Sequence, residues 1–508
     1  MAVPTTQTSP IVLDDAPPTV AEVVAIAHGA RVALGPVARA RIEASRAVVD
    51  ALAAGEELIY GLNTQLGHGR DERLGEDEIR AGQHMVVRMH AGGVGPPLAR
   101  EIVRAAVAVR IAGFARGGSG VTPSIADAYV AMLNAGVHPV VPLIGSVGAS
   151  DLMHMAAIAL VALGEGSAEL DGDVVDGATA LARAGIAPVQ LGPKDGLTLI
   201  SANGVAIGHA ALVVDRAARL ADAADVVGAV SLEAVSGNPS VLEPAVAAAK
   251  PVPGQAIAAA RIRELLRGSE LCTPGAATSV QDPLSFRVAP QVHGAFREVL
   301  DAARRAVDQE LAAADDNPYV SVDDGRMISN GNFHPMLLAL TIDAVRPALA
   351  HVGQLSDRRA GQLWDRLVQD PEVFRPESAA QLLRWGTPLV RYAGAARTAE
   401  LRGLAAPASL DVMPLDLGVE DHATMAPLAV RRTDEALGLA EEVLAVELLT
   451  ASTRVGWRTE TREKMAPRTR AVLDGLASVI ADVGPTAPPS AVHAAAVQFL
   501  RSIPEGPV

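Results

Sequence analysis

The chain has 508 residues and a formal net charge of −15 at pH 7. Because nucleic acids and anionic membranes are themselves negatively charged, neither is expected as a main partner of so acidic a chain. The single cysteine excludes an intrachain disulfide framework and is typical of a reducing compartment, and the N-terminus has no secretory pattern, so we predict a cytoplasmic protein.

Hydrophobic residues make up 49% of the chain, yet aromatic residues make up only 3%. This composition, rich in Ala, Leu and Val, is typical of long helices that pack closely through small side chains. No apolar run is a convincing membrane span. We predict a mainly all-α fold, with a flexible leader over residues 1–20 and one domain over residues 21–508.

In chain order, two amphipathic helical patterns occupy residues 19–54 and lead into a loop that contains Tyr60. Short strands are expected near residues 137–141 and 171–175. A hairpin is expected where residues 319–321 and 326–329 flank an Asp-Asp-Gly turn. Further helices are predicted over residues 105–115, 123–135, 178–184 and 431–453.

A small-residue turn, GSVGASDL, begins at Gly145 and runs into an apolar helical segment that ends near Gly164. Gly145 and Gly148 permit backbone angles that a Cβ would forbid, so Ala149, Ser150 and Asp151 are expected on a tight turn at a helix N-terminus. An ordinary helix cap is the simpler interpretation, because Ser and Asp are common cap residues.

The turn resembles the signature of the histidine and phenylalanine ammonia-lyase family, whose usual form is G-S-V-G-A-S-G-D-L. In that family Ala-Ser-Gly cyclises to the electrophile 4-methylideneimidazol-5-one (MIO). Here Asp151 follows Ser150 directly, so the Gly is missing. Ring closure requires the amide nitrogen after the serine to attack the Ala149 carbonyl, which is easiest at a residue without a Cβ. The resemblance implies no external cofactor, and MIO would have to form from Ala149, Ser150 and Asp151.

Other segments resemble the same family. Tyr60-Gly-Leu-Asn-Thr is similar to Y-G-x-N-T-G-F-G, whose Tyr removes the β-hydrogen of the substrate. His90 stands where a histidine marks the histidine-type members. Gln281 begins a segment similar to Q-D-x-Y-S-L-R, in which Arg287 offers a fixed fork for the substrate carboxylate and Leu284 replaces the usual Tyr.

The family's L-N-G motif, whose Asn supports the prosthetic ring, aligns without a gap at Ser201, and Asn203 follows two residues later. Asn317 belongs to a match with x-D-N-P, and Phe333 to a match with S-G-G-N-F-H. Glu420 belongs to a match with Q-E-D-H-V-S-M and is the natural partner of a departing amine or an imidazole nitrogen. Each of these residue types, taken alone, is more often structural.

The resemblance covers roughly residues 20–500 and implies an ammonia-lyase fold with a long central helical bundle. It also implies a homotetramer and a small amino acid as substrate. The missing Gly, Ser201 and Leu284 all fall on positions tied to the prosthetic group. The resemblance implies a C–N lyase that performs β-elimination on an aromatic, imidazole-bearing amino acid, either histidine or a histidine betaine such as ergothioneine, and the altered positions favour a reaction without MIO. Two alternatives stay open: a conventional MIO histidine or aromatic amino acid ammonia-lyase, and a catalytically silent binding protein. The scattered histidines support no metal site.

Overall fold

The computed structural model describes residues 9–370, 373, 390–410, 413–484 and 486–503. Its contacts divide the chain into two compact units. The first unit comprises Met1–Asp215, Arg304–Leu340 and Ala408–Arg431, and the second comprises Arg216–Ala303, Thr341–Pro407 and Arg432–Val508. This division into contact units does not test whether residues 21–508 form one domain, so that statement stays a prediction.

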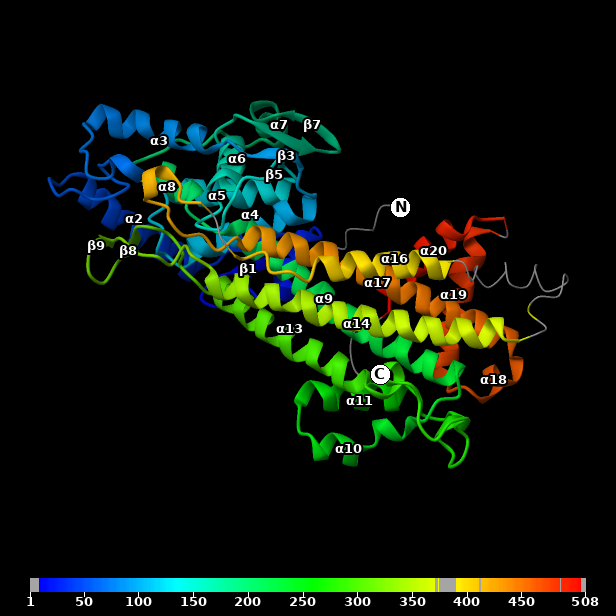
Figure 1. The fold of residues 1–508 in the computed structure, drawn as a ribbon. Helices are drawn as coiled ribbons and strands as arrows, with labels where there is room; N and C mark the ends of the chain where they lie inside the picture. The colour runs from blue at the N-terminus through cyan, green and yellow to red at the C-terminus, as the bar shows by residue number, and fades with distance from the viewer. Residues whose placement is uncertain (1–8, 371–372, 374–389, 411–412, 485, 504–508) are drawn as a thin grey trace. The chain divides into compact units, whose positions relative to one another are not determined.

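The first unit consists of helices and short strands (Figure 1). Its elements are β1 (Ile11–Leu13), α1 (Val20–Ala27), β2 (Val32–Leu34), α2 (Pro36–Ala53), η1 (Gly67–Gly69), α3 (Glu76–His90), β3 (Val94–Pro97), α4 (Arg100–Ala115), α5 (Pro123–Ala135), β4 (His138–Pro139), β5 (Pro142–Ile144), α6 (Leu152–Ala162), β6 (Ser167–Leu170), β7 (Asp173–Asp176), α7 (Gly177–Ala184), α8 (Asp195–Ile200), β8 (Tyr319–Ser321), β9 (Arg326–Ile328) and η6 (Asp416–Gly418).

The described residues of the second unit form helices and the segments that connect them. Its elements are η2 (Pro239–Leu242), α10 (Pro244–Ala249), α11 (Pro253–Leu265), η3 (Glu270–Cys272), α12 (Leu284–Arg287), α16 (Val390–Gly403), α18 (Thr459–Lys464), α19 (Pro467–Val483) and α20 (Pro489–Arg501). Four long helices have residues in both units: α9 (Gly204–Ala234), α13 (Ala289–Leu311), α14 (Met336–Val368) and α17 (Ala426–Trp457).

Local sequence explains where several helices begin. Thr19 and Glu22 form a reciprocal capping box at the start of α1, and Asp176 caps α7 through the Thr179 N–H. Proline occupies the first position of α2 and α5, where its missing N–H costs nothing. α5 has the predicted bounds, and α17 extends beyond the predicted 431–453 at both ends.

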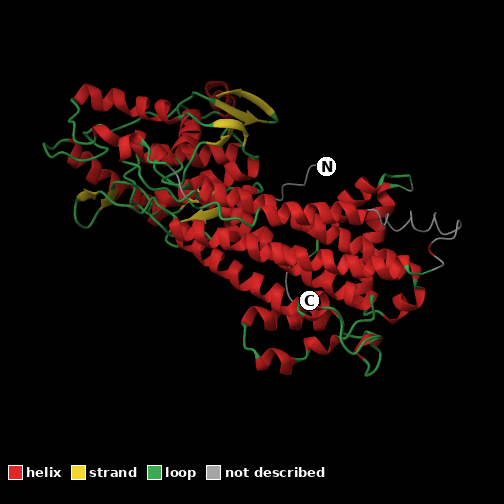
Figure 2. Ribbon diagram, in the orientation of Figure 1, coloured by secondary structure: helices red, strands yellow, loops and turns green. Residues whose placement is uncertain are grey.

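The strands form small two- and three-stranded sheets (Figure 2). β1 pairs in parallel with β2 through Ile11 and Val32, so the predicted flexible leader does not extend over residues 11–13. β8 and β9 form the predicted antiparallel hairpin. The sheet β4-β6-β7 contains the residues expected to be extended at 138–139 and 173–175, together with β6, which was not predicted. The mainly helical prediction is confirmed.

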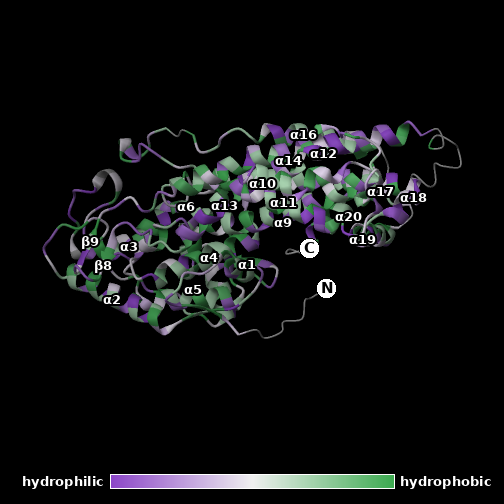
Figure 3. Ribbon diagram, turned by 90° about the horizontal axis from the view of Figure 1, so that it is seen from below, coloured by the Kyte–Doolittle hydropathy of each residue, from purple (hydrophilic) through white to green (hydrophobic). Residues whose placement is uncertain are grey.

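Apolar residues recur along α4 and α5 of the first unit (Figure 3). Phe114 in α4 and Tyr129 in α5 are fully buried. Phe114 and Tyr129 meet edge to face with ring centroids 5.6 Å apart. The second unit buries an ion pair between Arg359 and Glu447, whose Nε and Oε1 atoms are 2.6 Å apart. Replacing one member of such a pair by an uncharged residue strongly destabilises the folded protein, because the other charge is left unpaired in the core.

Two helical stretches, residues 195–234 and 336–368, are long and apolar enough to cross a membrane by length and composition alone. Within the window tested, 94% of the first stretch and 50% of the second are buried in the protein. Buried core helices pass the same test, so these stretches are weak indications of a span.

Candidate active site

The GSVGASDL turn is held between two loops of the first unit. Gly148 and Ser150 both have positive φ angles, of 82° and 61°. The Thr424 hydroxyl donates a hydrogen bond of 2.8 Å to the Gly148 carbonyl on one side. On the other side, the Ser150 N–H donates one of 3.1 Å to the Phe333 carbonyl. A non-glycine residue in the left-handed region is strained, and such strain is often found at functional sites.

Asp151 is fully buried and precedes α6, but its side chain does not cap that helix. Its carboxylate instead accepts hydrogen bonds of 2.7 Å from the Ser146 hydroxyl and 2.7 Å from the Ala206 N–H in the first turn of α9. Its own N–H donates to the Ala202 carbonyl at 2.8 Å. Burial raises the pKa of Asp151, against the opposing effects of His154 and these hydrogen bonds. The cap interpretation is therefore wrong for α6, because the carboxylate serves a different helix.

Asn203 lies beside the turn. Its Nδ2 donates to the Phe333 carbonyl at 2.8 Å, the same oxygen that accepts the Ser150 N–H. The Asn203 Oδ1 atom is buried and accepts no hydrogen bond from any described residue. Ser201 is occupied elsewhere, because its hydroxyl accepts from the Asn317 N–H at 3.4 Å. Ser201 and Asn203 were both candidates for the residue that supports the prosthetic ring in the family. Of the two, Asn203 is the one that shares a hydrogen-bond acceptor, the Phe333 carbonyl, with Ser150.

Asp315 binds the backbone of Asn203. Its Oδ2 accepts the Asn203 N–H at 2.9 Å. Burial, followed by the neighbouring Asp316 charge, raises the pKa of Asp315 to about 6. The Arg110 guanidinium opposes that shift and forms a fully buried pair with Asp316, with Nη2 and Oδ1 2.8 Å apart. Sequence reasoning did not select Asp315, although it directly precedes the matched D-N-P.

Tyr60 follows α2 in the segment that also contains Gly67. Burial raises the pKa of Tyr60, a hydrogen bond with the Gly67 backbone lowers it, and the charges of Glu420 and Asp416 raise it further. Burial also raises the pKa of Glu420, with a further contribution from Asp416, while His90 lowers it. Glu420 is thus within electrostatic range of both Tyr60 and His90 in the first unit.

Two of these groups are held by local backbone contacts. The His90 Nδ1 lies 2.7 Å from the Val86 carbonyl within α3, which leaves its Nε2 for another partner. Glu420 forms an antiparallel bridge with Leu415, and its N–H and carbonyl both bond to that residue. This tight turn brings Asp416 next to Glu420. Asp416 was missed from the sequence because no matched motif contains it.

The remaining predicted site residues are placed as follows. Ala149 is half-buried in the turn, and the Phe333 side chain is half-buried. The Asn317 Oδ1 accepts the Asn330 N–H at 3.0 Å. Gln281 is exposed and Arg287 is half-buried at the end of α12, both in the second unit. Their proximity to Tyr60 stays a prediction.

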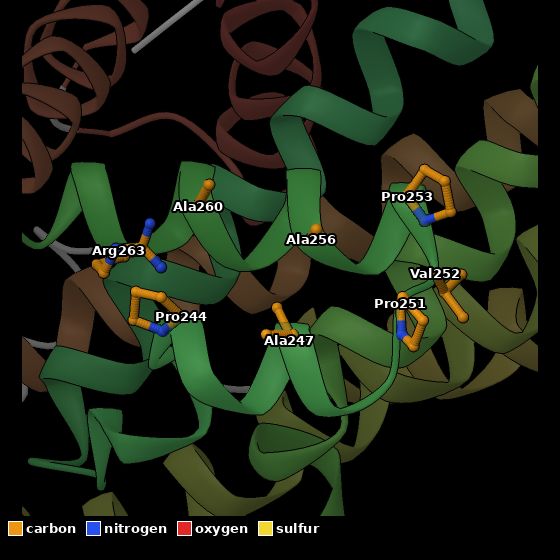
Figure 4. A pocket seen from close by; sticks show the side chains of 9 residues that line it. Pro244, Ala247, Pro251, Val252, Pro253, Ala256, Ala260 and Arg263 are labelled. Carbon is orange, nitrogen blue, oxygen red and sulfur yellow. The ribbon is translucent and has the colours of Figure 1, made fainter.

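A cavity of about 500 Å³ lies in the second unit between α10 and α11 (Figure 4). Proline, alanine and valine side chains line it, and Arg263 is the one charged residue among the described residues that line it. None of these described lining side chains can act as a base near neutral pH. This cavity therefore does not replace the Tyr60 region as the candidate reaction site.

Replacing Gly148 by alanine is expected to destabilise the protein by about 2–5 kcal/mol and to abolish activity. A Cβ there would overlap the Thr424 hydroxyl and lie 2.9 Å from the Ala426 backbone nitrogen. Gly172→Ala is the matched control, because Gly172 has a φ of 92° and nothing within 4 Å of its would-be Cβ. Thermal unfolding of both variants tests this. Equal losses of melting temperature would show that the turn is not tightly docked.

Comparison with known proteins gives a consistent result. The model of the family described as aromatic amino acid lyase matches residues 19–478. A histidine ammonia-lyase of Gloeobacter violaceus is 38% identical over 461 residues, which cover 90% of this chain and 88% of that protein. The ergothioneine-degrading ergothionase of Treponema denticola has a TM-score of 0.89 at 26% identity, covering 97% of this chain and 99% of that one. A histidine ammonia-lyase of Trypanosoma cruzi has a TM-score of 0.86 at 29% identity, covering 97% and 94%.

Proposed function

Because this chain belongs to the aromatic amino acid lyase family, we propose that it removes trimethylamine from a histidine betaine such as ergothioneine by β-elimination, without MIO. The chain is a carbon–nitrogen lyase by its family and its relatives. What we propose beyond this is that the substrate is a betaine, that MIO does not form, and that the protein is a cytoplasmic homotetramer. Ergothionase of Treponema denticola, a structural neighbour, is described as degrading ergothioneine.

The environment of Asp151 carries this proposal. The family is typically MIO-dependent, and closure of the ring would require the Asp151 nitrogen to attack the Ala149 carbonyl. That N–H is committed to the Ala202 carbonyl, and the carboxylate is bound to Ser146 and to the first turn of α9. A glycine would have neither the side chain nor its two hydrogen bonds. The residues present therefore do not fit the ring, and no step is assigned to it.

A betaine needs no added electrophile. A trimethylammonium group has no N–H to lose, so it stays a cationic leaving group in the presence of a base. In the proposed step, the Tyr60 oxygen takes the β-hydrogen, the C–H electrons form the C=C bond, and the C–N bond breaks to release neutral trimethylamine. The proton remains on Tyr60 until it passes to solvent.

The other charged groups have binding roles in this proposal. Glu420, with Asp416 beside it, faces the quaternary cation, and negative charge there favours it by simple electrostatics. His90 binds the imidazole ring through its free nitrogen. Arg287 pairs with the substrate carboxylate, as the family resemblance implies.

The kcat/KM value is expected to rise with pH and to be still rising at pH 10, because Tyr60 must lose its proton to act as a base and kcat/KM reports the free enzyme. Burial and two nearby carboxylates raise the pKa of Tyr60 above its ordinary 10.0, so the free enzyme holds the proton at neutral pH. A bound trimethylammonium group would lower that pKa. Glu420→Gln is expected to move the rising limb to lower pH, since it removes one of the charges that raise the pKa. A profile that is flat between pH 7 and pH 10 would contradict Tyr60 as the base.

Deamination of histidine itself is the second candidate, favoured by 38% identity to a histidine ammonia-lyase over 90% of this chain. One assay separates the two. The purified protein is incubated with histidine, with its trimethyl betaine and with ergothioneine, and conjugated imidazole acids are followed by absorbance. We expect product from a betaine alone. Product from histidine would support the second candidate, and no product from any substrate would overturn both.

A further inference from the structure

Two histidines of the first unit form a direct pair. His422 Nδ1 and His334 Nε2 are 3.1 Å apart, and the ring centroids are 5.0 Å apart at an interplanar angle of 38°. His334 lies two residues before the start of α14, and His422 lies in the loop before α17. The two rings therefore join two loops that are 88 residues apart in the sequence.

Both loops hold the Ser150 turn. The residue before His334 is Phe333, whose carbonyl accepts the Ser150 N–H. Two residues after His422 is Thr424, whose hydroxyl bonds the Gly148 carbonyl. Glu420 lies two residues before His422. The pair thus ties the Glu420 segment to the loop that fixes the other side of the turn.

We propose that the His334–His422 pair positions Glu420 for catalysis and acts as a clasp that opens when both rings are protonated. The inference rests on the proposed lyase function for its catalytic part. Neither ring is assigned a contact with substrate, so both are positioning residues.

The hydrogen bond between the two rings explains why it breaks only when both are protonated. One ring nitrogen must donate while the other offers a lone pair, which two neutral rings or one charged and one neutral ring can do. Two imidazolium rings have no acceptor and repel each other. Burial, and then the His422 charge, lowers the pKa of His334. The bond is therefore present above the ordinary histidine range and is lost as pH falls through the lowered value.

Few other charges act on the pair. Among the described residues, His422 is the one titratable group that shifts His334 from the facing loop. Glu420 and Asp421 directly precede His422 in its own segment. No described lysine or arginine bonds to either ring.

Three variants test the clasp. His422→Ala breaks the bond and is expected to lower kcat roughly 3- to 10-fold with a smaller change in KM. The double variant H334Q/H422N keeps donor and acceptor near the same places but cannot titrate. It is expected to recover most of kcat and to move the acid limb of the pH profile to lower pH. His28→Ala, at an exposed histidine of the first unit, is the matched control and should leave both unchanged.

A second readout does not depend on turnover. The melting temperature of the wild type is expected to fall more steeply between pH 7 and pH 5 than that of H334Q/H422N. Parallel curves, or a His422→Ala enzyme with wild-type kcat and pH profile, would overturn the clasp. If no substrate is turned over but the melting curves diverge as expected, the proposed function fails while the titrating pair stands.

Discussion

Replacing the trimethylammonium group of the substrate by a primary ammonium group is expected to lower kcat/KM by roughly 10³-fold or more. A base strong enough to take a β-hydrogen takes an N–H proton first, and the resulting neutral amine is a very poor leaving group. The described partners of Asp151, which are the Ser146 hydroxyl, the Ala206 N–H and the Ala202 carbonyl, offer no electrophile to activate such an amine. Parallel kinetics with histidine and its trimethyl betaine, at the same pH, measure the ratio directly.

The matched control is the dimethylated amino acid, which differs from the betaine by one methyl group but has an N–H to lose. It should behave like histidine if the leaving group decides the rate. It should behave like the betaine if the size of the pocket decides. Equal kcat/KM values for all three compounds would mean that the enzyme activates the amine, contrary to a MIO-free mechanism.

Tyr60→Phe is expected to lower kcat by about 10²- to 10⁴-fold, the usual contribution of a positioned general base. The substitution removes one oxygen and keeps the ring, so the packing of this largely buried side chain changes little. Substrate affinity should be nearly unchanged, because Glu420, His90 and Arg287 are proposed to provide the binding. Steady-state kinetics measure the effect on kcat, and binding of an unreactive substrate analogue measures the effect on affinity separately.

Tyr392→Phe is the control, since Tyr392 is 72% exposed in the second unit. It should keep wild-type kcat. A Tyr60→Phe enzyme with a normal melting temperature and more than a tenth of wild-type activity would exclude Tyr60 as the base. Loss of folding would instead point to a structural hydroxyl, and the Gly67 backbone contact makes that outcome measurable by thermal unfolding.

Local sequence patterns predicted the helices well, because the start and end of a helix depend on residues close together in the sequence. Pro123 and Gly136 bound α5 by fixing its first turn and its left-handed end, and both signals are visible in the sequence. β1 was not predicted, because its three residues become a strand only through pairing with β2. A short segment whose order depends on a distant partner leaves little local signal.

The site divides in the same way. Motif matches selected Tyr60, His90 and Glu420, whose charges interact in the structure. Asp416 and Asp315 were missed because their importance comes from what lies against them in three dimensions. The choice between Ser201 and Asn203 also depended on tertiary contact, since alignment without a gap favoured Ser201 while the Phe333 carbonyl binds Asn203.

The proposed mechanism depends on the chemical state of the peptide that contains Ser150, and mass spectrometry measures that state directly. Peptide mapping across Gly145–Met153 of the purified protein is predicted to give the mass of the unmodified sequence. Ser150→Ala, which cannot dehydrate, should then differ from the wild type by one oxygen atom alone. A wild-type peptide lighter by two waters would show a closed ring and contradict the MIO-free mechanism.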